Sequence, residues 1–294
     1  MPTTANTNSQ TILITGASSG IGRATALALD RAGYRVLAGV RRPEDGASLK
    51  AEAGSTLEML VLDITVREHI DAARQHVETM TAGHGLFALI NNAGFNYNAA
   101  YEYTDETKAR ALMEVNLFGA HAMSVAMLPL LRQRAMSSGK TSKLINIGSI
   151  GSLVGIPWEA FYHASKFALL GLSESIRHEV YAQGIRVSVV MPGGIKTPFI
   201  AKSKTGSQQA IEVLPQEGAR RYGRGLARMA ELTSMVDRFG SAPEKVGRRV
   251  VQLLEQRNPP FRALVGFDAY LMNGLRATLP TPVFHAMLRR QFDC

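Results

Sequence analysis

The chain has 294 residues, of which 46% are hydrophobic and 19% are charged, and its glycine and proline contents are near the globular average. This composition excludes a disordered or collagen-like protein, and the single cysteine, Cys294, excludes a disulfide scaffold and a cysteine-based zinc site. The net charge of +9 is uneven: residues 1–194 hold 17 Lys and Arg against 16 Asp and Glu, and residues 195–294 hold 16 against 8. We expect one α/β domain, with or without a modest appendage, from a reducing compartment.

Short runs of β-branched and apolar residues alternate along the chain with segments of helical periodicity. The runs predict strands at 11–15, 34–40, 57–62, 86–90, 144–147, 185–190 and 261–266. The periodic segments predict helices at 21–32, 67–80, 105–136, 161–182 and 243–256. This alternation predicts a doubly wound parallel sheet with helices on both faces, and such sheets bind ligands at the carboxyl ends of their strands.

Three segments lie outside this alternation. The polar residues 1–10 lack the apolar stretch of a signal peptide, and we find no apolar run of the roughly 18 residues that span a bilayer, so we expect a cytoplasmic protein. Residues 200–240 are rich in Gly, Ser, Lys and Arg with few apolar residues, which predicts a mobile lid over the crevice. Residues 267–294 form a C-terminal extension whose role periodicity does not indicate.

A glycine-rich turn, TGASSGIG at residues 15–22, connects the first predicted strand to the first predicted helix. Glycine at these positions lets the backbone approach a pyrophosphate, and the N–H groups at the start of the helix then face the phosphate. The turn predicts dinucleotide binding through Gly16, Ser18, Ser19, Gly20, Ile21 and Gly22.

The end of the second strand bears on the choice of dinucleotide. A site for NAD would place an acid here to accept hydrogen bonds from the ribose, but the chain has Val40 followed by Arg41 and Arg42. Guanidinium groups match a 2′-phosphate in charge and geometry, which favours NADP(H); two solvated loop arginines are the alternative. Asp63, after the third strand, is a candidate for the adenine region or for capping the next helix.

Tyr162 and Lys166 lie one helical turn apart, so that both side chains share a face. A Tyr–Lys pair at this spacing is weak evidence alone. Its position is more telling, because Ser149 lies thirteen residues upstream, directly after a predicted strand of the same sheet.

With these motifs in order, residues 9–199 resemble the short-chain dehydrogenase/reductase family. The resemblance rests on the glycine loop, the Asn91–Gly94 turn, Asn116, Ser149, Tyr162-x-x-x-Lys166 and Pro192-Gly193 followed by Thr197. It implies a Rossmann-type fold in a single domain, with Asn116, Ser149, Tyr162 and Lys166 as the catalytic tetrad. It also implies cofactor contacts at Asp63, Ile64, Asn92, Ala93, Gly94, Tyr162, Lys166, Pro192, Gly193, Ile195 and Thr197. The segments 34–46 and 193–199 are most similar to the hydroxysteroid- and retinol-dehydrogenase-like branch.

The residue types suit reduction of a carbonyl group, which needs a hydride and a proton at the developing alkoxide. The ordinary pKa of tyrosine, about 10, is high for a base near neutrality, and a neighbouring Lys166 ammonium is expected to lower it. Ser149 is expected to donate a hydrogen bond to the substrate oxygen, and Asn116 to hold a water in a relay to Lys166.

Apolar side chains near the strand ends predict a pocket for a hydrophobic carbonyl compound or alcohol, although they could equally belong to the core; they are Phe95, Val154, Ile156, Trp158 and Phe199. We expect His163, His121 and His69 to be structural. No His, Asp and Glu group has ligand spacing, so we expect no metal site.

The sequence therefore predicts an NADP(H)-dependent ketone reductase or alcohol dehydrogenase acting on a steroid-, retinoid- or lipid-like substrate. The alternatives are a 3-oxoacyl-(acyl-carrier) reductase, whose usual length is shorter, and a non-catalytic NADP-sensing protein, which would usually have lost the Tyr or Lys. Apolar residues along 111–131 predict a homodimer or homotetramer. The scattered bases of the last third do not favour a nucleic-acid partner; they fit a solvated helical surface, a weak contact with anionic lipid or an acidic substrate.

Overall fold

Seven parallel strands form one sheet in the computed structural model of the protein, which describes residues 10–294. Their order is β3-β2-β1-β4-β5-β6-β7, so that the direction of winding reverses between β1 and β4. The strands are β1 (Thr11–Ile14), β2 (Arg35–Val40), β3 (Leu57–Val61), β4 (Ala88–Asn91), β5 (Ser142–Ile147), β6 (Ile185–Pro192) and β7 (Arg262–Val265). The predicted doubly wound sheet is confirmed, and its crevice lies where the winding reverses.

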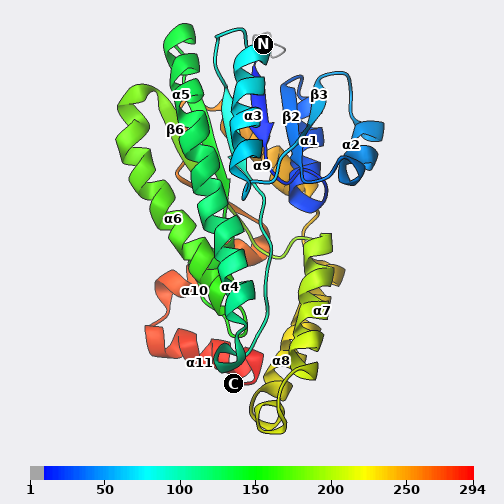
Figure 1. The fold of residues 1–294 in the computed structure, drawn as a ribbon. Coiled ribbons are helices and arrows are strands. Elements are labelled where there is room, and N and C mark those ends of the chain that lie inside the picture. The colour runs from blue at the N-terminus through cyan, green and yellow to red at the C-terminus, as the bar shows by residue number, and fades with distance from the viewer. Residues whose placement is uncertain (1–9) are drawn as a thin grey trace.

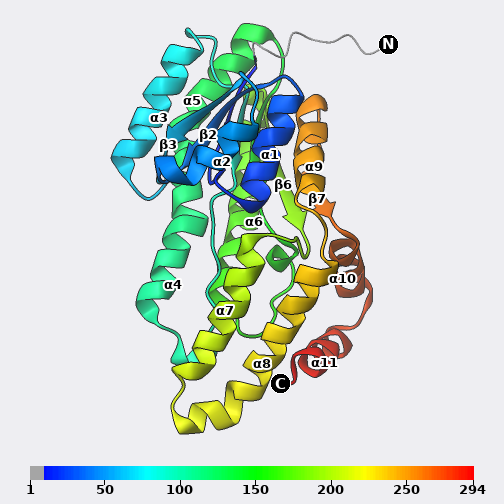
Figure 2. The same ribbon diagram turned by 90° about the vertical axis from the view of Figure 1, so that its right-hand side faces the viewer.

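Helices cover both faces of the sheet (Figures 1 and 2). Because successive side chains of a strand point to opposite faces, Ile12 and Ile14 join one apolar core and Leu13 joins the other. The first core includes residues of α1 (Gly20–Arg31), α2 (Ala47–Glu52) and α9 (Glu244–Glu255). The second includes residues of α3 (Arg67–Met80), α5 (Ala120–Ser138) and α6 (Ala160–Val180).

The helix predicted at 105–136 contains a change of geometry. α4 (Glu106–Met113) continues through a π-helical turn, Glu114–Gly119, into α5. Such turns are frequent at functional sites, and this one carries Asn116. Glu106–Ser138 is long and apolar enough to span a membrane by length and composition, but 44% of its most apolar window is buried and α5 packs on β4 and β5. One face of α5 therefore joins the core of the sheet.

Residues 200–240 fall almost entirely in two helices, which periodicity did not predict; that they form a mobile lid stays a prediction. α7 (Pro198–Glu212) and α8 (Gln216–Phe239) form a hairpin below the sheet (Figure 2). Their small residues permit close packing: a Cβ at Gly225 would lie 2.3 Å from the Trp158 ring, and one at Gly218 2.8 Å from the Tyr103 ring. Gly218 and Gly225 are therefore required by packing between elements, which composition alone did not reveal.

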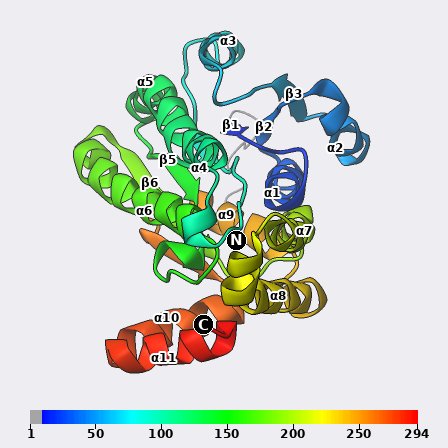
Figure 3. The ribbon, with the colours of Figure 1, turned by 60° about the horizontal axis from the view of Figure 1, so that its bottom comes forward.

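The C-terminal extension forms two further helices, α10 (Phe267–Thr278) and α11 (Thr281–Phe292). Figure 3 shows them beside α8, with the C-terminus close to that helix. Phe284, Leu288 and Phe292 are buried with Val154 and Met229 in one apolar cluster. The extension thus covers the segment after β5, on which the site is built.

Candidate active site

The glycine loop is fixed against the turn that follows β4. Asn92 Nδ2 donates hydrogen bonds to the carbonyl oxygens of Thr15 (2.9 Å) and Gly16 (3.0 Å). Gly16 has a φ of +66°, and a Cβ at this position would lie 2.8 Å from Ala93 Cα. A Cβ at Gly22 would lie 2.1 Å from the Gly16 oxygen. Larger residues would separate these segments, so the glycines are required by packing as well as by backbone angle.

Two helix N-termini meet at this loop. Ser19 is the N-cap of α1 and makes no side-chain capping bond, and the first turn of α1 has no acidic residue. Thr197, the N-cap of α7, likewise makes no capping bond, and its Cβ would lie 3.2 Å from a Cβ at Gly20. Uncapped N–H groups and the positive ends of helix dipoles favour an anion, so these residues fit the diphosphate of a dinucleotide.

The two arginines after β2 differ in their partners. Arg42 is about two-thirds exposed and pairs with Asp45 at 2.8 and 3.0 Å, and this hydrogen bond lowers the pKa of Asp45. Arg41 is exposed and forms no ion pair within residues 10–294. Arg41 is therefore the more available of the two for a phosphate group.

Asp63 stabilises the turn that leads into α3. Its Oδ1 accepts hydrogen bonds from the Thr65 amide (2.9 Å) and hydroxyl (2.7 Å). Burial tends to raise its pKa, but these bonds and the charge of Arg41 outweigh burial and lower the pKa. The neighbouring Ile64 is buried and packs on Gly119, since a Cβ built at Gly119 would lie 2.7 Å from the Ile64 side chain. A contact of either residue with adenine stays a prediction.

The four residues of the predicted tetrad come together at the carboxyl ends of β4 and β5. Ser149 follows β5, while Tyr162 and Lys166 lie on the first turns of α6 and Asn116 on the π-helical turn. Lys166 Nζ lies 5.9 Å from the centroid of the Tyr162 ring. Asn116 and Lys166 both lie beside Gly94. A Cβ built at Gly94 would lie 3.0 Å from Asn116 Oδ1 and 3.8 Å from Lys166 Nζ.

Hydrogen bonds fix two members of this group. Lys166 Nζ donates to the Ile147 carbonyl at 2.9 Å. Asn116 Nδ2 donates to the Phe95 carbonyl (2.9 Å) and to Ser165 Oγ (3.1 Å), and its Oδ1 accepts from the Phe95 amide (3.0 Å). Asn116 therefore holds the segment after β4 beside the Tyr–Lys pair.

Burial controls the charges of the Tyr–Lys pair. It raises the pKa of Tyr162, the charge of Glu159 adds to this rise, and the Ser149 side chain opposes it. Burial also lowers the pKa of Lys166 to about 8. The expectation that Lys166 brings the tyrosine pKa below its ordinary value does not hold for the chain alone, because burial raises this pKa and the opposing contribution comes from the Ser149 side chain. Tyr162 is accordingly protonated at neutral pH and can donate a proton.

Glu159 is a buried carboxylate that sequence reasoning did not single out. Its Oε1 accepts hydrogen bonds from Asn96 Nδ2 (2.5 Å) and Ser203 Oγ (3.4 Å), and its Oε2 lies 3.5 Å from His163 Nε2. His163 Nδ1 is bonded to the Gly151 carbonyl at 3.0 Å, in keeping with its expected structural role. The only signal in the sequence was an isolated acid between an apolar segment and Tyr162.

The five residues predicted to line a substrate pocket occupy two different places. The Phe199 ring lies 5.8 Å from the Tyr162 ring, and Phe95 is joined to Asn116. Trp158 instead packs on Gly225 of α8, and its Nε1 is buried with no hydrogen-bond partner among the described residues. Val154 packs with the C-terminal helices, and Ile156 contacts the same cluster. Phe95 and Phe199 thus adjoin the tetrad directly.

The segment after β6 is held by residues that follow it in the chain. A Cβ at Gly193 would lie 2.2 Å from Asp268 Oδ2, which accepts a hydrogen bond from the Gly194 amide at 2.5 Å. Ile195 is buried and forms a bridge with Ser241. Asp268, on α10, is a second residue that sequence reasoning missed, since nothing in its local pattern indicates this partner. Pro192 ends β6, so this segment reaches Thr197 from the carboxyl edge of the sheet.

Comparison with known proteins agrees with this geometry. A family model described as short chain dehydrogenase matches residues 10–208. The chain is 36% identical to a 3-ketodihydrosphingosine reductase from Bacteroides thetaiotaomicron, over 87% of this chain and 88% of that protein. It is 32% identical to human retinol dehydrogenase 5, over 94% and 87% of the two chains. A short chain dehydrogenase from Burkholderia cenocepacia, solved in complex with NADP, superposes with a TM-score of 0.72 at 27% identity, covering 97% and 99%.

The packing of the glycine loop leads to a pair of opposite predictions. Gly22→Ala should lower the free energy of unfolding by about 1–3 kcal/mol, because the added methyl meets the Gly16 carbonyl and the Asn92 amide. Gly274→Ala on α10 should instead raise it by about 0.5–1 kcal/mol, because nothing lies within 4 Å of its Cβ and alanine favours helix. Urea denaturation measures both, and equal effects would contradict the assigned role of the loop.

Proposed function

The chain belongs to the short-chain dehydrogenase family, and from that premise we propose that it uses NADP(H) to interconvert a ketone or aldehyde and an alcohol on a hydrophobic substrate. As a member it is an oxidoreductase acting on CH–OH or C=O groups. The observation that carries the proposal is the convergence of Ser149, Tyr162, Lys166 and Asn116 beside a loop that fits a diphosphate. The names of relatives, which include a ketodihydrosphingosine reductase, an estradiol dehydrogenase and a retinol dehydrogenase, support a hydrophobic substrate.

In the proposed reaction the residues divide the work between proton transfer and orientation. The nicotinamide, when bound, would supply or accept the hydride. The buried and protonated Tyr162 hydroxyl donates a proton to the developing alkoxide, and Ser149 donates a hydrogen bond to the same oxygen. Lys166 would bind the nicotinamide ribose. Asn116 fixes the Phe95 segment beside Lys166, and we retain the proposal that it also holds a water in the relay.

The preference for NADP(H) rests on the end of β2. Val40 is buried and apolar where an NAD site would have an acid, and Arg41 has no ion pair among the described residues. The solved relative with bound NADP supports the same choice. Arg42 would have to exchange part of its contact with Asp45 for the phosphate, so Arg41 is the main contributor in this proposal.

A second copy of the chain is proposed to cover the outer face of α5 and α6. Phe118 on the π-helical turn before α5, Val125 on α5 and Phe167 on α6 are each about half exposed. Large apolar side chains on neighbouring helices are unusual for a surface that stays in water. They support a twofold contact, as in a homodimer or homotetramer.

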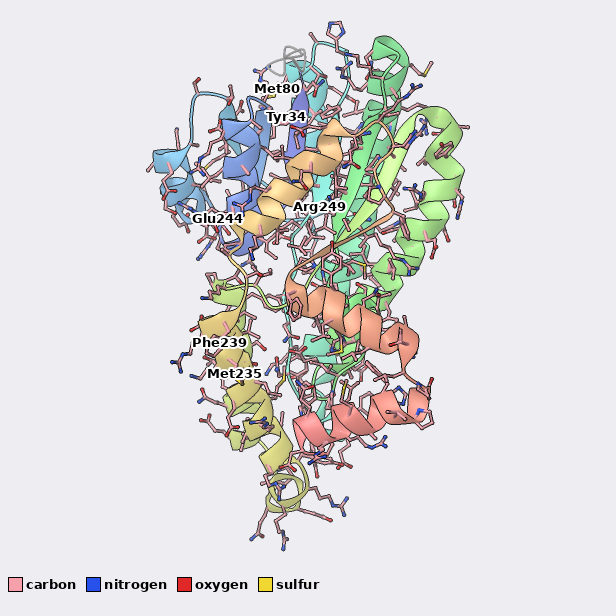
Figure 4. The ribbon with its side chains drawn as sticks, turned by 180° about the vertical axis from the view of Figure 1, so that it is seen from behind. Tyr34, Met80, Met235, Phe239, Glu244 and Arg249 are labelled. Carbon is pink, nitrogen blue, oxygen red and sulfur yellow. The ribbon has the colours of Figure 1, made fainter. Side chains whose placement is uncertain are left out.

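We retain the proposals that the α7–α8 hairpin is a substrate lid and that the basic last third contacts anionic lipid. The hairpin lies beside the glycine loop, as a lid requires. Met235 and Phe239 are exposed on α8 (Figure 4), where they could enter a membrane surface. Three arginines of α8 already pair with acids, namely Arg221 with Glu217, Arg224 with Asp293 and Arg228 with Glu231, which weakens the charge available to lipid.

A substrate panel tests the proposed activity. Oxidation of NADPH, followed by its absorbance, should be observed with at least one member of a set of steroids, retinals, 3-oxoacyl esters and aryl ketones. Turnover of 3-oxoacyl esters alone would favour the 3-oxoacyl reductase alternative. Binding of NADPH without turnover of any member would favour the NADP-sensing alternative.

Replacing Tyr162 by Phe removes the proton donor and keeps the ring. Turnover should fall by about 10²–10⁴-fold, the usual contribution of general acid catalysis, while NADPH binding and the far-ultraviolet spectrum stay unchanged. Tyr181→Phe is the matched control, because Tyr181 is half exposed at the end of α6 and should be replaced without effect. Wild-type turnover in Tyr162→Phe would remove Tyr162 from the mechanism.

Replacing Arg41 and Arg42 together by Ala should raise the KM for NADPH at least about tenfold and leave the KM for NADH nearly unchanged. The expected loss of NADPH binding free energy is that of a hydrogen bond to a charged group, about 1.5–3 kcal/mol. Arg67→Ala, which removes an exposed arginine paired with Asp71 on α3, is the control. A wild-type enzyme that has equal kcat/KM with the two cofactors would refute the NADP preference.

Light scattering tests the proposed assembly. At micromolar concentration the particle should be at least twice the chain mass of 31.9 kDa. Phe118→Lys combined with Phe167→Glu should reduce it to a single chain, because charges would be buried at the contact. A wild-type particle of one chain mass would exclude a stable dimer.

A further inference from the structure

A cavity of about 440 Å³ opens between α4 and α7, outside the tetrad. Figure 1 shows the segment after β4 passing between these two helices, and this segment forms the floor. We call the cavity the α4–α7 groove, and it is lined by Phe95, Tyr103, Lys108, Lys202, Gly206 and Ala210 among others. Its size falls in the range of small-molecule sites, about 300–1,000 Å³.

The wall formed by α7 is long and smooth. Lys202, Gly206, Ala210 and Val213 follow one another at helical spacing, so one face of α7 borders the groove over roughly 16 Å. The atom nearest to a Cβ built at Gly206 is Asn98 Oδ1, at 3.8 Å, so the helix surface is open there. A long trough of this kind suits an extended chain better than a fused ring system.

The polar groups of the floor are already paired. Asn98 is buried, and its Nδ2 donates to Ser207 Oγ at 2.9 Å and to Ser203 Oγ at 3.4 Å. These bonds tie α7 to the floor. What remains to contact a ligand is largely apolar, from Ala99, Ala100 and the Tyr103 ring.

One end of the groove adjoins the tetrad. Phe95 lines the groove, and its backbone is bonded on both sides to Asn116. Asn96 also lines it, and its side chain donates to Glu159, three residues before Tyr162. For a molecule whose carbonyl group sits at Tyr162, the way into the groove would lead past Phe95.

The charge of the groove is positive. Lys108 and Lys202 stand on opposite walls, and none of the described residues that line it is acidic. Lys108 lies over the Tyr97 ring, at 5.7 Å from the centroid, and 3.9 Å from an Asp105 carboxylate oxygen. Both lysines are exposed, so they attract an anion and disfavour a cation without being committed to a short ion pair.

We propose that the α4–α7 groove binds an unbranched alkyl chain that carries a carboxylate, so that the substrate class is a long-chain oxo acid and its hydroxy counterpart. The assignment of this ligand as substrate rests on the proposed oxidoreductase function. Its binding to the groove does not, because it follows from shape and charge alone.

Isothermal titration of the full chain with dodecanoate measures binding in the absence of turnover. Gly206→Leu should weaken binding at least tenfold, because the leucine fills open space along α7. Gly223→Leu on α8 is the matched control and should change it less than twofold, since nothing lies within 4 Å of its Cβ. Lys108→Ala and Lys202→Ala should each weaken it about threefold, as expected for exposed charges.

Two further probes separate the contributions of chain and charge. Acetate should show no saturable binding, and dodecyltrimethylammonium should bind at least several-fold more weakly than dodecanoate. Equal binding of the two long-chain probes, or an unchanged affinity in Gly206→Leu, would overturn the proposal. So would a Lys202→Ala variant that loses affinity only for NADPH, since the pKa of Asp45 is lowered mainly by Arg42 but also by Lys202.

Turnover then distinguishes this inference from the proposed function. A long-chain oxo acid should be reduced, and Gly206→Leu should lower kcat/KM for it at least tenfold while leaving a short aryl ketone unaffected. An enzyme that reduces other ketones but no long-chain oxo acid would overturn the substrate class alone. An enzyme that binds dodecanoate and reduces no carbonyl compound would overturn the proposed function and leave the groove assignment intact.

Discussion

The close contact between the glycine loop and the turn after β4 is the constraint on which the rest of the site depends. Asn92 bonds to the carbonyls of Thr15 and Gly16, and Gly16 and Gly22 leave no room for a side chain. This contact joins the two strands between which the winding reverses, β1 and β4. It aims the N-terminus of α1 at the crevice and, through Gly94 and the Phe95 segment, sets the position of Asn116. The residues proposed for phosphate binding and those proposed for proton transfer are therefore positioned by the same packed contact.

Burial sets the protonation of this site. It raises the pKa of Tyr162, which therefore keeps its proton, and it lowers the pKa of Lys166 to about 8. Glu159, held by Asn96 and Ser203, adds a buried negative charge that acts on Tyr162. Alcohol oxidation would need the tyrosinate, which these surroundings disfavour. The raised pKa also makes Tyr162 a weaker acid, so in the chain alone burial opposes proton transfer in both directions.

The sheet, the loop and the tetrad could be predicted from the sequence because their signals are local. A strand of four to eight residues, a glycine turn or a Tyr-x-x-x-Lys spacing is complete within one stretch of chain, and the sheet brings such stretches together at one edge. Glu159, Asp268 and the α7–α8 hairpin could not be predicted, since their meaning lies in distant partners. Glu159 needs Ser203 of α7, Asp268 needs the Gly194 amide, and the glycines of α8 need Trp158 and Tyr103. Without knowledge of those partners, the glycine-rich composition of the α7–α8 hairpin resembles that of a mobile segment.

The residues proposed for the reaction carry local sequence motifs, whereas part of the proposed substrate groove does not. The family match ends at residue 208, within α7, and nearly all residues proposed for hydride and proton transfer precede that point. One wall of the α4–α7 groove lies on α7, whose position is set by α8, and α8 in turn packs on α11 of the C-terminal extension. If the proposed groove binds the substrate, substrate choice would depend on residues of the family-matched region and, at the end of α7, on residues beyond it. Because α7 also begins at Thr197, next to the glycine loop, a ligand that shifts the groove wall acts on the end of the helix that faces the cofactor. In the proposed reaction, α7 would therefore couple the two halves of the site, with its N-terminus beside the phosphate and its length along the substrate.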